Sequence, residues 1–550
     1  MSELKRVSFV SLGCAKNLVD SEKMLGQLAE AGCAITADED DAEVTVINTC
    51  GFLEASRTEA DEVIREAVAR KRNGVLQRVV VAGCLVQRDK EAILERIKGI
   101  DALVGVNNRD DIVRAVLGMP SPRPSPGGRG GRPSPRPSDP PFLVGSSDPT
   151  GRGGKPSPRP SDPPSLVGSS DPEGRGGRPS PRPSDPPFLV GSSDPTGRGG
   201  RRTTDVYLSD YHPFVQLDTA RLRITPRHYA YLRISEGCDQ KCTFCTIPSI
   251  RGRMHCKPPE VVLAEARELV SDGAVEISLI GQDTTSYGMG EDKFDVGLAG
   301  LLRKLNTVAG LRWIRLMYAY PSVFSDEMIE TIADCEHVCK YIDIPLQHIN
   351  DKMLKAMHRR VDRATTERLL QKIRDRIPGV AIRTTLIAGF PGETDEQVDE
   401  LVEFVRSFRF DALGVFPYSR EMETPSGRMA GQIPEAVKEE RVEALMGAQQ
   451  EVAFALAEER VGREFEVLVD GVENVETPKR RNAETRGRIP VAKARHQGQA
   501  PGVDSVTYVE SGEAAPGEFL TVRCVARQDY DLIAMPTRVG LPVLVSGNRQ

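Results

Sequence analysis

The chain has 550 residues, a formal net charge of −6 at pH 7 and eleven cysteines. This length exceeds what a single hydrophobic core supports, so we expect several domains, and the negative charge argues against a general affinity for nucleic acid. The sequence begins without an apolar signal segment and contains no run of about eighteen apolar residues. We therefore expect a cytoplasmic protein without a membrane span. Its cysteines then favour metal binding or catalysis over a disulfide framework.

Residues 1–118 alternate between apolar strands and amphipathic helices. Strands are expected at "VSFVSLG", "VTVINTC" and "RVVVAGC", with helical patterns between them. In the first helix, "DSEKMLGQLAEAG", Asp20 or Ser21 is the expected N-cap and Gly32 is the expected terminator. This alternation predicts a Rossmann-like α/β domain with a parallel sheet.

A cysteine follows each of the three strands by one to three residues. Cys14, Cys50 and Cys84 are spaced by 36 and 34 residues, and each spacing is the length of one βαβ unit. The carboxyl ends of parallel strands meet at one edge of the sheet, where α/β proteins bind ligands. Cysteines also follow strands by chance, because a buried cysteine packs as a small apolar residue. Three in register favour a metal site with three thiolate ligands.

Residues 119–202 contain a tandem repeat rich in Pro, Gly, Ser and Arg. The 23-residue unit "RPSPRPSDPPFLVGSSDPTGRGG" begins at residue 132 and recurs, with small changes, at 155 and 178. Its few apolar residues cannot bury enough surface to offset the entropy of ordering, and its prolines do not fit a solenoid unit. We predict a disordered insertion that acts as a spacer between two domains. A partner-binding role for its arginines is the alternative.

A second set of three cysteines lies in "SEGCDQKCTFC", residues 235–245, directly after the strand-like "YAYLRI". Structural zinc sites use four ligands and disulfides use cysteines in pairs. Cys238, Cys242 and Cys245 can instead hold three irons of a 4Fe-4S cluster and leave the fourth iron open. This spacing therefore predicts a cluster that binds a substrate or cofactor.

Five cysteines lie outside the two triads. Ferredoxins use related spacings with a fourth cysteine, and Cys256, Cys335 and Cys339 are the candidates for that ligand. Cys335 and Cys339 are four residues apart on an expected helix, and we interpret both as packing residues. The same interpretation applies to Cys33, Cys256 and Cys524.

Residues 203–460 show repeated βα units, as a partial parallel (β/α) barrel requires. Strands are expected in "AVEISLIGQDTTSYG", "WIRLMYAYP", "YIDIPLQH", "AIRTTLIAGFPGET" and "ALGVFPYS". Active sites of such barrels collect at the carboxyl ends of the strands. The residues expected at this mouth are Gln282, Asp283, Gln347, His348 and the turn from Gly389 to Gly392.

Two of these mouth positions have an ordinary structural interpretation as well. Thr394 and Gln397 match a capping box, so "GFPGET" could be only a βα turn and the start of a helix. His348 could be a rim histidine whose hydrogen bonds are satisfied within the fold.

From residue 461 to 535, β-rich segments separated by Gly and Pro predict a small antiparallel β-barrel. Between them, "KRRNAETRGRIPVAKAR" at 479–495 carries seven basic residues and one acidic residue. This segment could contact phosphate or an acidic protein surface, or could be a solvated loop.

These regions together resemble the radical S-adenosylmethionine (SAM) methylthiotransferases, which combine an N-terminal three-cysteine domain, a radical SAM barrel and a C-terminal TRAM domain. The resemblance covers the whole chain except the repeat insertion. "SLGCAKNLVDSE", "FCTIPSIRG", "RLMYAYP" and "PLQH" are most similar to the RimO type, which modifies an aspartate of ribosomal protein uS12. The tRNA-modifying branch, where "GCQMN" is usual in place of "GCAKN", is the close alternative.

The resemblance implies two 4Fe-4S clusters and S-adenosyl-L-methionine as cofactors. The triad in the barrel would support cleavage of SAM to a 5'-deoxyadenosyl radical, which takes hydrogen from the β-carbon of the aspartate. The N-terminal triad would hold the sulfur to be inserted. The resemblance also implies that Phe244 fills the aromatic position before the last cysteine and that the polar mouth residues bind SAM. Implied partners are uS12, or tRNA in the alternative, and a reductant such as flavodoxin or ferredoxin.

Two hypotheses belong to other classes of protein. An iron-sulfur electron carrier would need closed sites with four cysteines each. A zinc-stabilised nucleic-acid-binding protein is supported by the basic segment and opposed by the lack of a four-ligand set. Iron and sulfide analysis separates these hypotheses from the enzyme.

Overall fold

The computed structural model describes residues 5–120, 204–209, 215–290, 292–476, 488–511 and 514–537. The predicted disorder of the repeats falls on residues outside the described ones, as does the basic segment from 479 to 487. No helix within the described ranges is long and apolar enough to cross a membrane.

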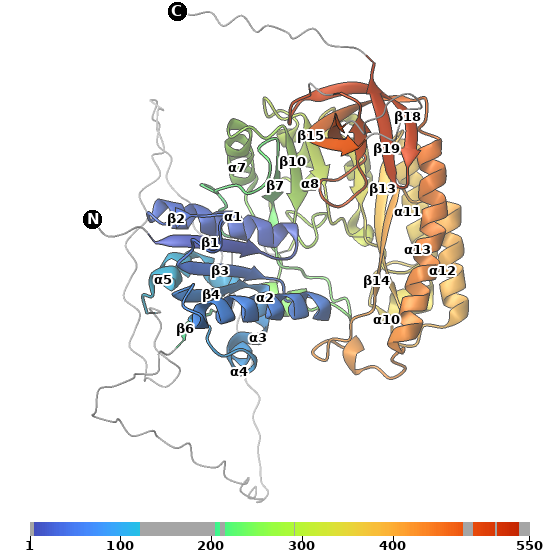
Figure 1. The fold of residues 1–550 in the computed structure, drawn as a ribbon. Helices are drawn as coiled ribbons and strands as arrows, with labels where there is room; N and C mark the ends of the chain where they lie inside the picture. Colours follow the sequence, from blue (N-terminus) through green and yellow to red (C-terminus); the bar gives the residue numbers. More distant parts are fainter. Residues whose placement is uncertain are drawn as a thin grey trace, which may run out of the picture. The chain divides into compact units, whose positions relative to one another are not determined.

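The N-terminal region forms a parallel sheet with the strand order β2-β1-β3-β4-β5-β6, so the predicted Rossmann-like fold is confirmed (Figure 1). Its last strand follows the insertion and pairs with β5, since Ala102 is opposite Asp205. The strands are β1 (Arg6–Ser11), β2 (Ala34–Ile35), β3 (Val44–Thr49), β4 (Arg78–Gly83), β5 (Ala102–Gly105) and β6 (Asp205–Tyr207). The helices are α1 (Ala15–Glu30), α2 (Glu54–Arg72), α3 (Cys84–Asp89), η1 (Lys90–Ala92), α4 (Ile93–Arg96), η2 (Val106–Asp111) and α5 (Ile112–Leu117).

The central region forms a second parallel sheet, in the order β14-β13-β12-β11-β10-β7, which confirms the partial barrel. Its strands are β7 (Tyr229–Arg233), β10 (Glu276–Ile280), β11 (Trp313–Leu316), β12 (Val338–Asp343), β13 (Ala381–Ala388) and β14 (Ala412–Pro417), and β8 (Ser235–Glu236) pairs separately with β9 (His255–Cys256). The helices are α6 (Ile247–Arg251), α7 (Pro259–Ser271), α8 (Leu298–Leu305), η3 (Pro321–Val323), α9 (Asp326–Asp334), α10 (Asp351–Ala356), α11 (Arg363–Arg376), α12 (Asp395–Phe408), η4 (Ser426–Arg428) and α13 (Glu435–Glu458).

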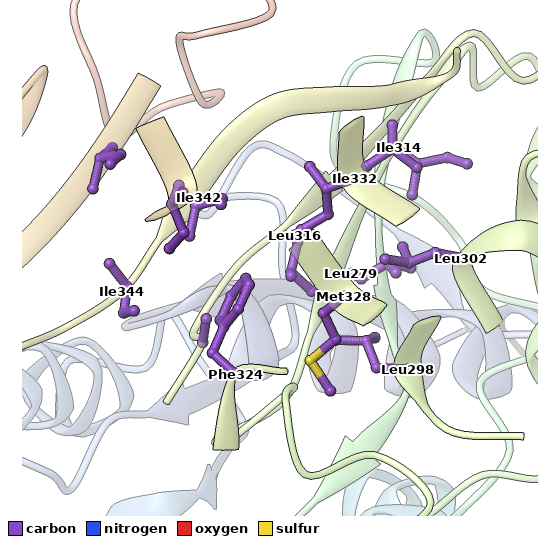
Figure 2. Close-up of a cluster of buried hydrophobic side chains, with 14 of the residues drawn as sticks. Leu279, Leu298, Leu302, Ile314, Leu316, Phe324, Met328, Ile332, Ile342 and Ile344 are labelled. Atoms are coloured by element: carbon purple, nitrogen blue, oxygen red, sulfur yellow. The ribbon is translucent and has the colours of Figure 1, made fainter. Parts of the chain in front are cut away.

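The largest apolar core lies between this sheet and its covering helices. In α8, Leu298, Leu301, Leu302 and Leu305 recur at helical spacing and are fully buried, because one face of the helix is apolar. Figure 2 shows side chains of α8 and α9 close to Leu279, Ile314 and Leu316 of the strands.

The C-terminal region is a closed barrel in the order β15-β16-β17-β19-β18, which confirms the small β-barrel. Neighbouring strands are antiparallel except β17 and β19, which are parallel. The strands are β15 (Glu464–Glu476), β16 (Arg488–His496), β17 (Thr507–Val509), β18 (Phe519–Gln528) and β19 (Asp531–Pro536).

The basic segment is not a loop where the structure describes it. Residues 488–496 are β16, and Arg495 is 1 % exposed. Its guanidinium lies 2.8 Å from Glu276 Oε2 on β10 and donates to Asp470. Arg495 therefore joins the small barrel to the amino-terminal ends of the central strands and does not face a phosphate.

The N-cap expected for the first helix was wrong. Helix α1 begins at Ala15, with Cys14 as its N-cap, so Asp20 and Ser21 lie inside the helix. The carboxylate of Asp20 is instead used in ion pairs with arginines. The end of α1 agrees with the expectation, because Gly32 follows it with a φ of +81°.

Cys335 and Cys339 do not share a helix. Cys335 is the C-cap of α9, and Cys339 lies on β12. Both side chains are buried, as packing residues are. Four-residue spacing predicted a helix here, but the helix ends where the next strand must begin.

Helix α1 is packed closely against the segment that leads into β7. Leu222 donates its backbone N–H to Glu22 O at 3.1 Å, and Lys23 Nζ donates to Thr219 O at 2.7 Å. A Cβ on Gly26 would lie 2.1 Å from the backbone oxygen of Ala220. Only glycine permits this approach of helix and chain.

This contact predicts opposite effects for two helical glycines. Gly26→Ala should lower the stability by about 1–3 kcal/mol, because the added methyl overpacks the contact. Gly447→Ala should raise it by about 0.5–1 kcal/mol, because a Cβ at this position in α13 meets no atom within 4 Å and alanine favours the helix. Urea unfolding of both variants measures the two changes in the free energy of unfolding. Changes of the same sign would contradict the packing at Gly26.

Candidate active site

The three N-terminal cysteines lie at one edge of the first sheet. Cys14 follows β1 and caps α1, Cys50 directly follows β3, and Cys84 directly follows β4. These three strands are neighbours and parallel, so their carboxyl ends point the same way. Cys14 is exposed, Cys50 is half-buried and Cys84 is buried.

Glycines set the spacing of these three loops. Gly13 has a φ of +96°, and a Cβ on it would lie 2.8 Å from Cys50 Cβ. Gly83 has a φ of +98°, and a Cβ on it would lie 2.2 Å from Asn48 Oδ1. Both positions require a left-handed backbone and leave no room for a side chain.

Asn17 ties the same loops together with its amide. Its Nδ2 donates to Leu12 O at 3.1 Å and to Thr49 O at 2.8 Å, which joins the loops that follow β1 and β3. Its Oδ1 lies 3.2 Å from Cys84 Sγ and accepts a 2.7 Å hydrogen bond from Arg251. One side chain thus connects all three loops with the central domain.

The loop of the second triad is anchored at several points along its length. Gln240 donates to Asp283 at 2.9 Å, and Thr243 Oγ1 donates to Ala356 O at 2.8 Å. At Cys242, Arg359 Nη1 donates to the sulfur at 3.6 Å. These contacts hold the loop against the carboxyl ends of the barrel strands.

Burial governs the protonation of these thiols. It raises the pKa of Cys84, Cys238 and Cys245 to about 12 each. A bound metal reverses this preference, because its positive charge deprotonates the thiols that coordinate it.

The chemistry of the two donor sets fits iron-sulfur clusters. Within the described ranges, no three His, Cys, Asp or Glu side chains lie close enough to share a single metal ion. A 4Fe-4S cluster binds each thiolate through a different iron and accepts a wider spacing. Guanidinium groups of Arg251 and Arg359 donate to the sulfurs of Cys84 and Cys242, as an anionic thiolate requires.

The predicted mouth residues fall into two groups, and the first adjoins the second triad. Gln282 donates to Glu236 at 2.6 Å, and Asp283 is buried with hydrogen bonds from Gln240, Thr285 and Ser286. Phe244 packs against an apolar cluster that includes Phe390, Met353, Met357 and Tyr418.

The second group centres on Glu393, which sequence reasoning missed. His348 is fully buried; its Nδ1 accepts from the backbone N–H of Ile349 and Asn350, and its Nε2 lies 3.3 Å from Glu393 Oε1. Gly389 donates its N–H to Glu393 Oε2 at 2.7 Å. The side chain of Gln347 is half-buried, and the backbone at this residue has a φ of +75°.

The turn before α12 is a βα turn followed by a capped helix start, which is the structural interpretation considered from the sequence. Thr394 and Gln397 form the capping box, with both reciprocal hydrogen bonds present. Gly389 and Gly392 have φ values of +79° and +80°, which this βα turn requires.

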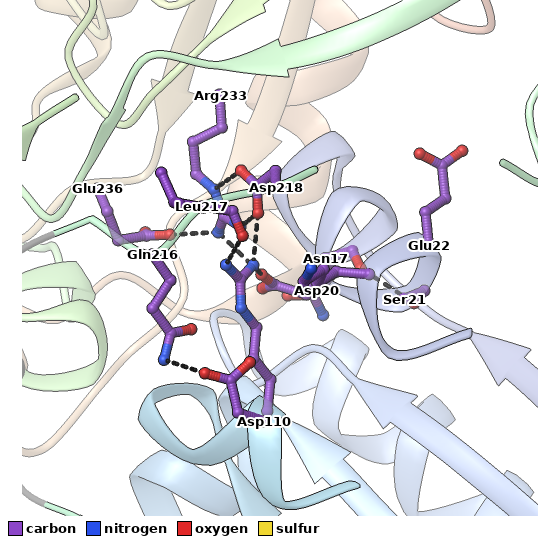
Figure 3. A network of polar contacts seen from close by, with 12 residues as sticks. Asn17, Asp20, Ser21, Glu22, Asp110, Gln216, Leu217, Asp218, Arg233 and Glu236 are labelled. Atoms are coloured by element: carbon purple, nitrogen blue, oxygen red, sulfur yellow. Dashed lines mark hydrogen bonds and ion pairs between the residues drawn. The ribbon is translucent and has the colours of Figure 1, made fainter. Parts of the chain in front are cut away.

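Buried ion pairs attach α1 to the central domain, and none of them was found from the sequence (Figure 3). Asp20 lies 2.8 Å from both Arg109 and Arg233 and 3.1 Å from Arg251. Glu236 pairs with Arg233 and Arg251 at 2.6 and 2.9 Å. Burial alone would raise the pKa of Glu236, but these arginines outweigh it and lower the pKa to about 2.

Lys16 and Tyr318 were also missed. The ammonium of Lys16 lies 3.0 Å from the centroid of the Tyr318 ring, and the side chain is 7 % exposed. Burial lowers the pKa of Lys16 to about 8. No short-range pattern in "GCAKN" signals this contact, because Tyr318 belongs to another domain.

Three family models match the chain in succession. They are the Uncharacterized protein family UPF0004 over residues 6–105, the Radical SAM superfamily over 232–405 and the TRAM domain over 461–536. Among solved structures, the radical S-adenosylmethionine methyltransferase TsrM from Kitasatospora setae is 14 % identical with a TM-score of 0.47, covering 88 % of this chain and 80 % of its own. That match is too distant to carry an argument.

Curated relatives match over almost the full length. Ribosomal protein uS12 methylthiotransferase RimO of Anaeromyxobacter sp. (strain K) is 37 % identical, covering 98 % of this chain and 96 % of its own length. The protein of the same name from Geotalea uraniireducens (strain Rf4) is 36 % identical, covering 96 % and 98 %. With this identity over both full lengths and with all three domains in place, the chain belongs to the RimO family of radical S-adenosylmethionine methylthiotransferases.

Proposed function

We propose that this chain transfers a methylthio group to the β-carbon of an aspartate in ribosomal protein uS12, the protein that its relatives are named for. The observation that carries the proposal is the position of α6 between the two triads. Cys245 lies two residues before α6, and Arg251 at its end donates to Cys84 Sγ at 3.2 Å. Two three-thiolate sites on either side of one short helix suit a reaction that needs both C–H activation and sulfur delivery.

The family implies one 4Fe-4S cluster and S-adenosylmethionine, and we assign that cluster to Cys238, Cys242 and Cys245. A second 4Fe-4S cluster, held by Cys14, Cys50 and Cys84, is part of the proposal. When bound, such clusters supply an electron for the reductive cleavage of SAM and an iron open to sulfur. The electron comes from a reductant such as flavodoxin or ferredoxin.

The chain's own residues position these groups. Gln282, Gln347 and the backbone of Gly389 and Gly392 line the SAM site in this proposal, with Phe244 packing beside it. Asp283, His348 and Glu393 would not line the site but would position residues around it. Asp283 fixes Gln240 in the cysteine loop, and His348 with Glu393 fixes the Gly389 turn.

The experiment that tests the function is mass spectrometry of uS12 and of tRNA from cells with and without the gene. A methylthio mass shift on an aspartate of uS12 that depends on the gene is the expected result. A shift on tRNA adenosine with unmodified uS12 would overturn the proposal in favour of the tRNA branch.

The two triads should be separable by composition and product. Replacing Cys238, Cys242 and Cys245 with Ala should remove about half of the iron and sulfide and abolish SAM cleavage. Replacing Cys14, Cys50 and Cys84 with Ala should preserve 5'-deoxyadenosine formation and abolish the methylthio product. Iron analysis and liquid chromatography of anaerobically reconstituted protein measure both results.

A matched control removes three buried cysteines outside the triads. The triple Ala variant of Cys33, Cys335 and Cys524 should keep the iron content of the parent. If the Cys14, Cys50 and Cys84 variant kept full iron or still made product, the second cluster would be wrong.

Arg251 should be essential to the junction between the triads. Arg251→Met removes one partner from each of the buried carboxylates of Asp20 and Glu236. This change should lower the free energy of unfolding by about 3–5 kcal/mol. Arg303→Met is the matched control, because the pair of Arg303 with Glu327 is solvent-exposed and worth at most about 1 kcal/mol. Denaturation followed by the fluorescence of Trp313 measures both, and similar small losses would contradict the buried geometry.

A further inference from the structure

Lys16 is a buried cation without an anionic partner in the described part of the chain. Its side chain is 7 % exposed, and no carboxylate oxygen of a described residue lies within 4.0 Å of its Nζ. The ammonium lies over the face of the Tyr318 ring, 3.0 Å from the centroid. Such a contact contributes roughly 0.5–2 kcal/mol.

The charged groups around Lys16 are already paired. Besides the thiol of Cys14, these groups are Arg251, Glu236 and Asp343. Arg251 donates to Glu236 at 2.9 Å, and Asp343 accepts a 2.8 Å hydrogen bond from Arg383. The ammonium donates to no oxygen of a described residue, so it can donate to a group that comes from outside.

Its position is fixed from both sides. The first turns of α1 reach the carboxyl ends of the barrel strands, where Ala15 and Val19 share an apolar cluster with Ile280 and Met317. Tyr318 is held by its backbone, because its N–H donates to Asp343 Oδ2 at 3.0 Å and its oxygen accepts from Thr284. Lys16 thus lies at the mouth of the barrel, two residues from the N-terminal triad.

We propose that Lys16 binds the side-chain carboxylate of the substrate aspartate, a role that rests on the function proposed above. The new C–S bond forms at the β-carbon, so the carboxylate persists from substrate to product. Once the aspartate is buried at the mouth, its charge needs a partner. The ammonium of Lys16, which donates to no oxygen of a described residue, supplies that partner.

This contact would also orient the reacting atom. The β-carbon is bonded directly to the carboxyl carbon, at about 1.5 Å. Fixing the carboxylate on Lys16 therefore fixes the β-carbon close to Cys14 and to the mouth. An asparagine, which carries no charge, would lose this interaction.

The test is a double-mutant cycle on binding. The parent and Lys16→Met are each titrated anaerobically with fluorescently labelled uS12 and with uS12 whose modified aspartate, located from the product mass spectrum, is changed to asparagine. Either change alone should weaken binding by about 10- to 100-fold. The two together should weaken it no further, because they remove the same contact.

Additive losses would overturn the proposal. So would a raised Kd of Lys16→Met for S-adenosylmethionine with the binding of uS12 unchanged, since the partner would then be the carboxylate of SAM. Lys16→Arg should recover part of the affinity for uS12, and failure to recover any would indicate a purely packing role. The loss of affinity for the asparagine form of uS12 is measured with the parent enzyme. A folding defect of Lys16→Met therefore does not affect this measurement.

The outcome is distinct from failure of the proposed function. If the parent neither binds nor modifies uS12, the function is wrong. If the parent does both and the cycle shows no coupling, the function stands and the role of Lys16 is wrong.

Discussion

The placement of α1 on the barrel depends on a balance of buried charge. Asp20 on α1 meets Arg109 from its own domain and Arg233 and Arg251 from the barrel, all within about 3 Å. Each of these ions has lost its water, at a cost of several kcal/mol, and only the opposite charges offset it. A helix shifted by one turn would take Asp20 away from all three arginines and leave its buried carboxylate without these partners. The ion pairs therefore fix the register of α1, and with it the position of Cys14 over the mouth.

The other end of the barrel is closed in a similar way. Glu276, at the start of β10, pairs with Arg315 of β11 and Arg495 of the small barrel, and Asp470 pairs with Arg495 and His228. The small barrel therefore binds the amino-terminal ends of the strands, opposite the cysteines.

The common edge of the three N-terminal cysteines could be predicted from the sequence because the signal is local and repeated. A cysteine one to three residues after each of three apolar strands needs only the topology of a parallel sheet to lie at one edge with the others. The start of α1 was mispredicted because Asp20 and Ser21 are good N-caps, and the chain instead uses Asp20 in long-range ion pairs.

Contacts between residues far apart in sequence account for the remaining errors. Arg495 looked like part of a basic surface because its neighbours in sequence are basic, yet its partners are Glu276 and Asp470. The roles of Lys16 and Glu393 were likewise invisible, since Tyr318 and His348 lie far away in sequence. Such partners become known only when the fold brings these distant residues together.

The glycines beside the N-terminal cysteines help to order the three cysteine loops as the sheet folds. Gly13 and Gly83 fit closely against the neighbouring loops, and Asn17 ties these loops together, so the fold itself sets the spacing of the loops that carry the cysteines. The folding of the sheet already orders these loops, so the cluster proposed for them would bind to a preformed site. Its loading would then be a separate step after folding, and its removal would leave the fold of the sheet intact.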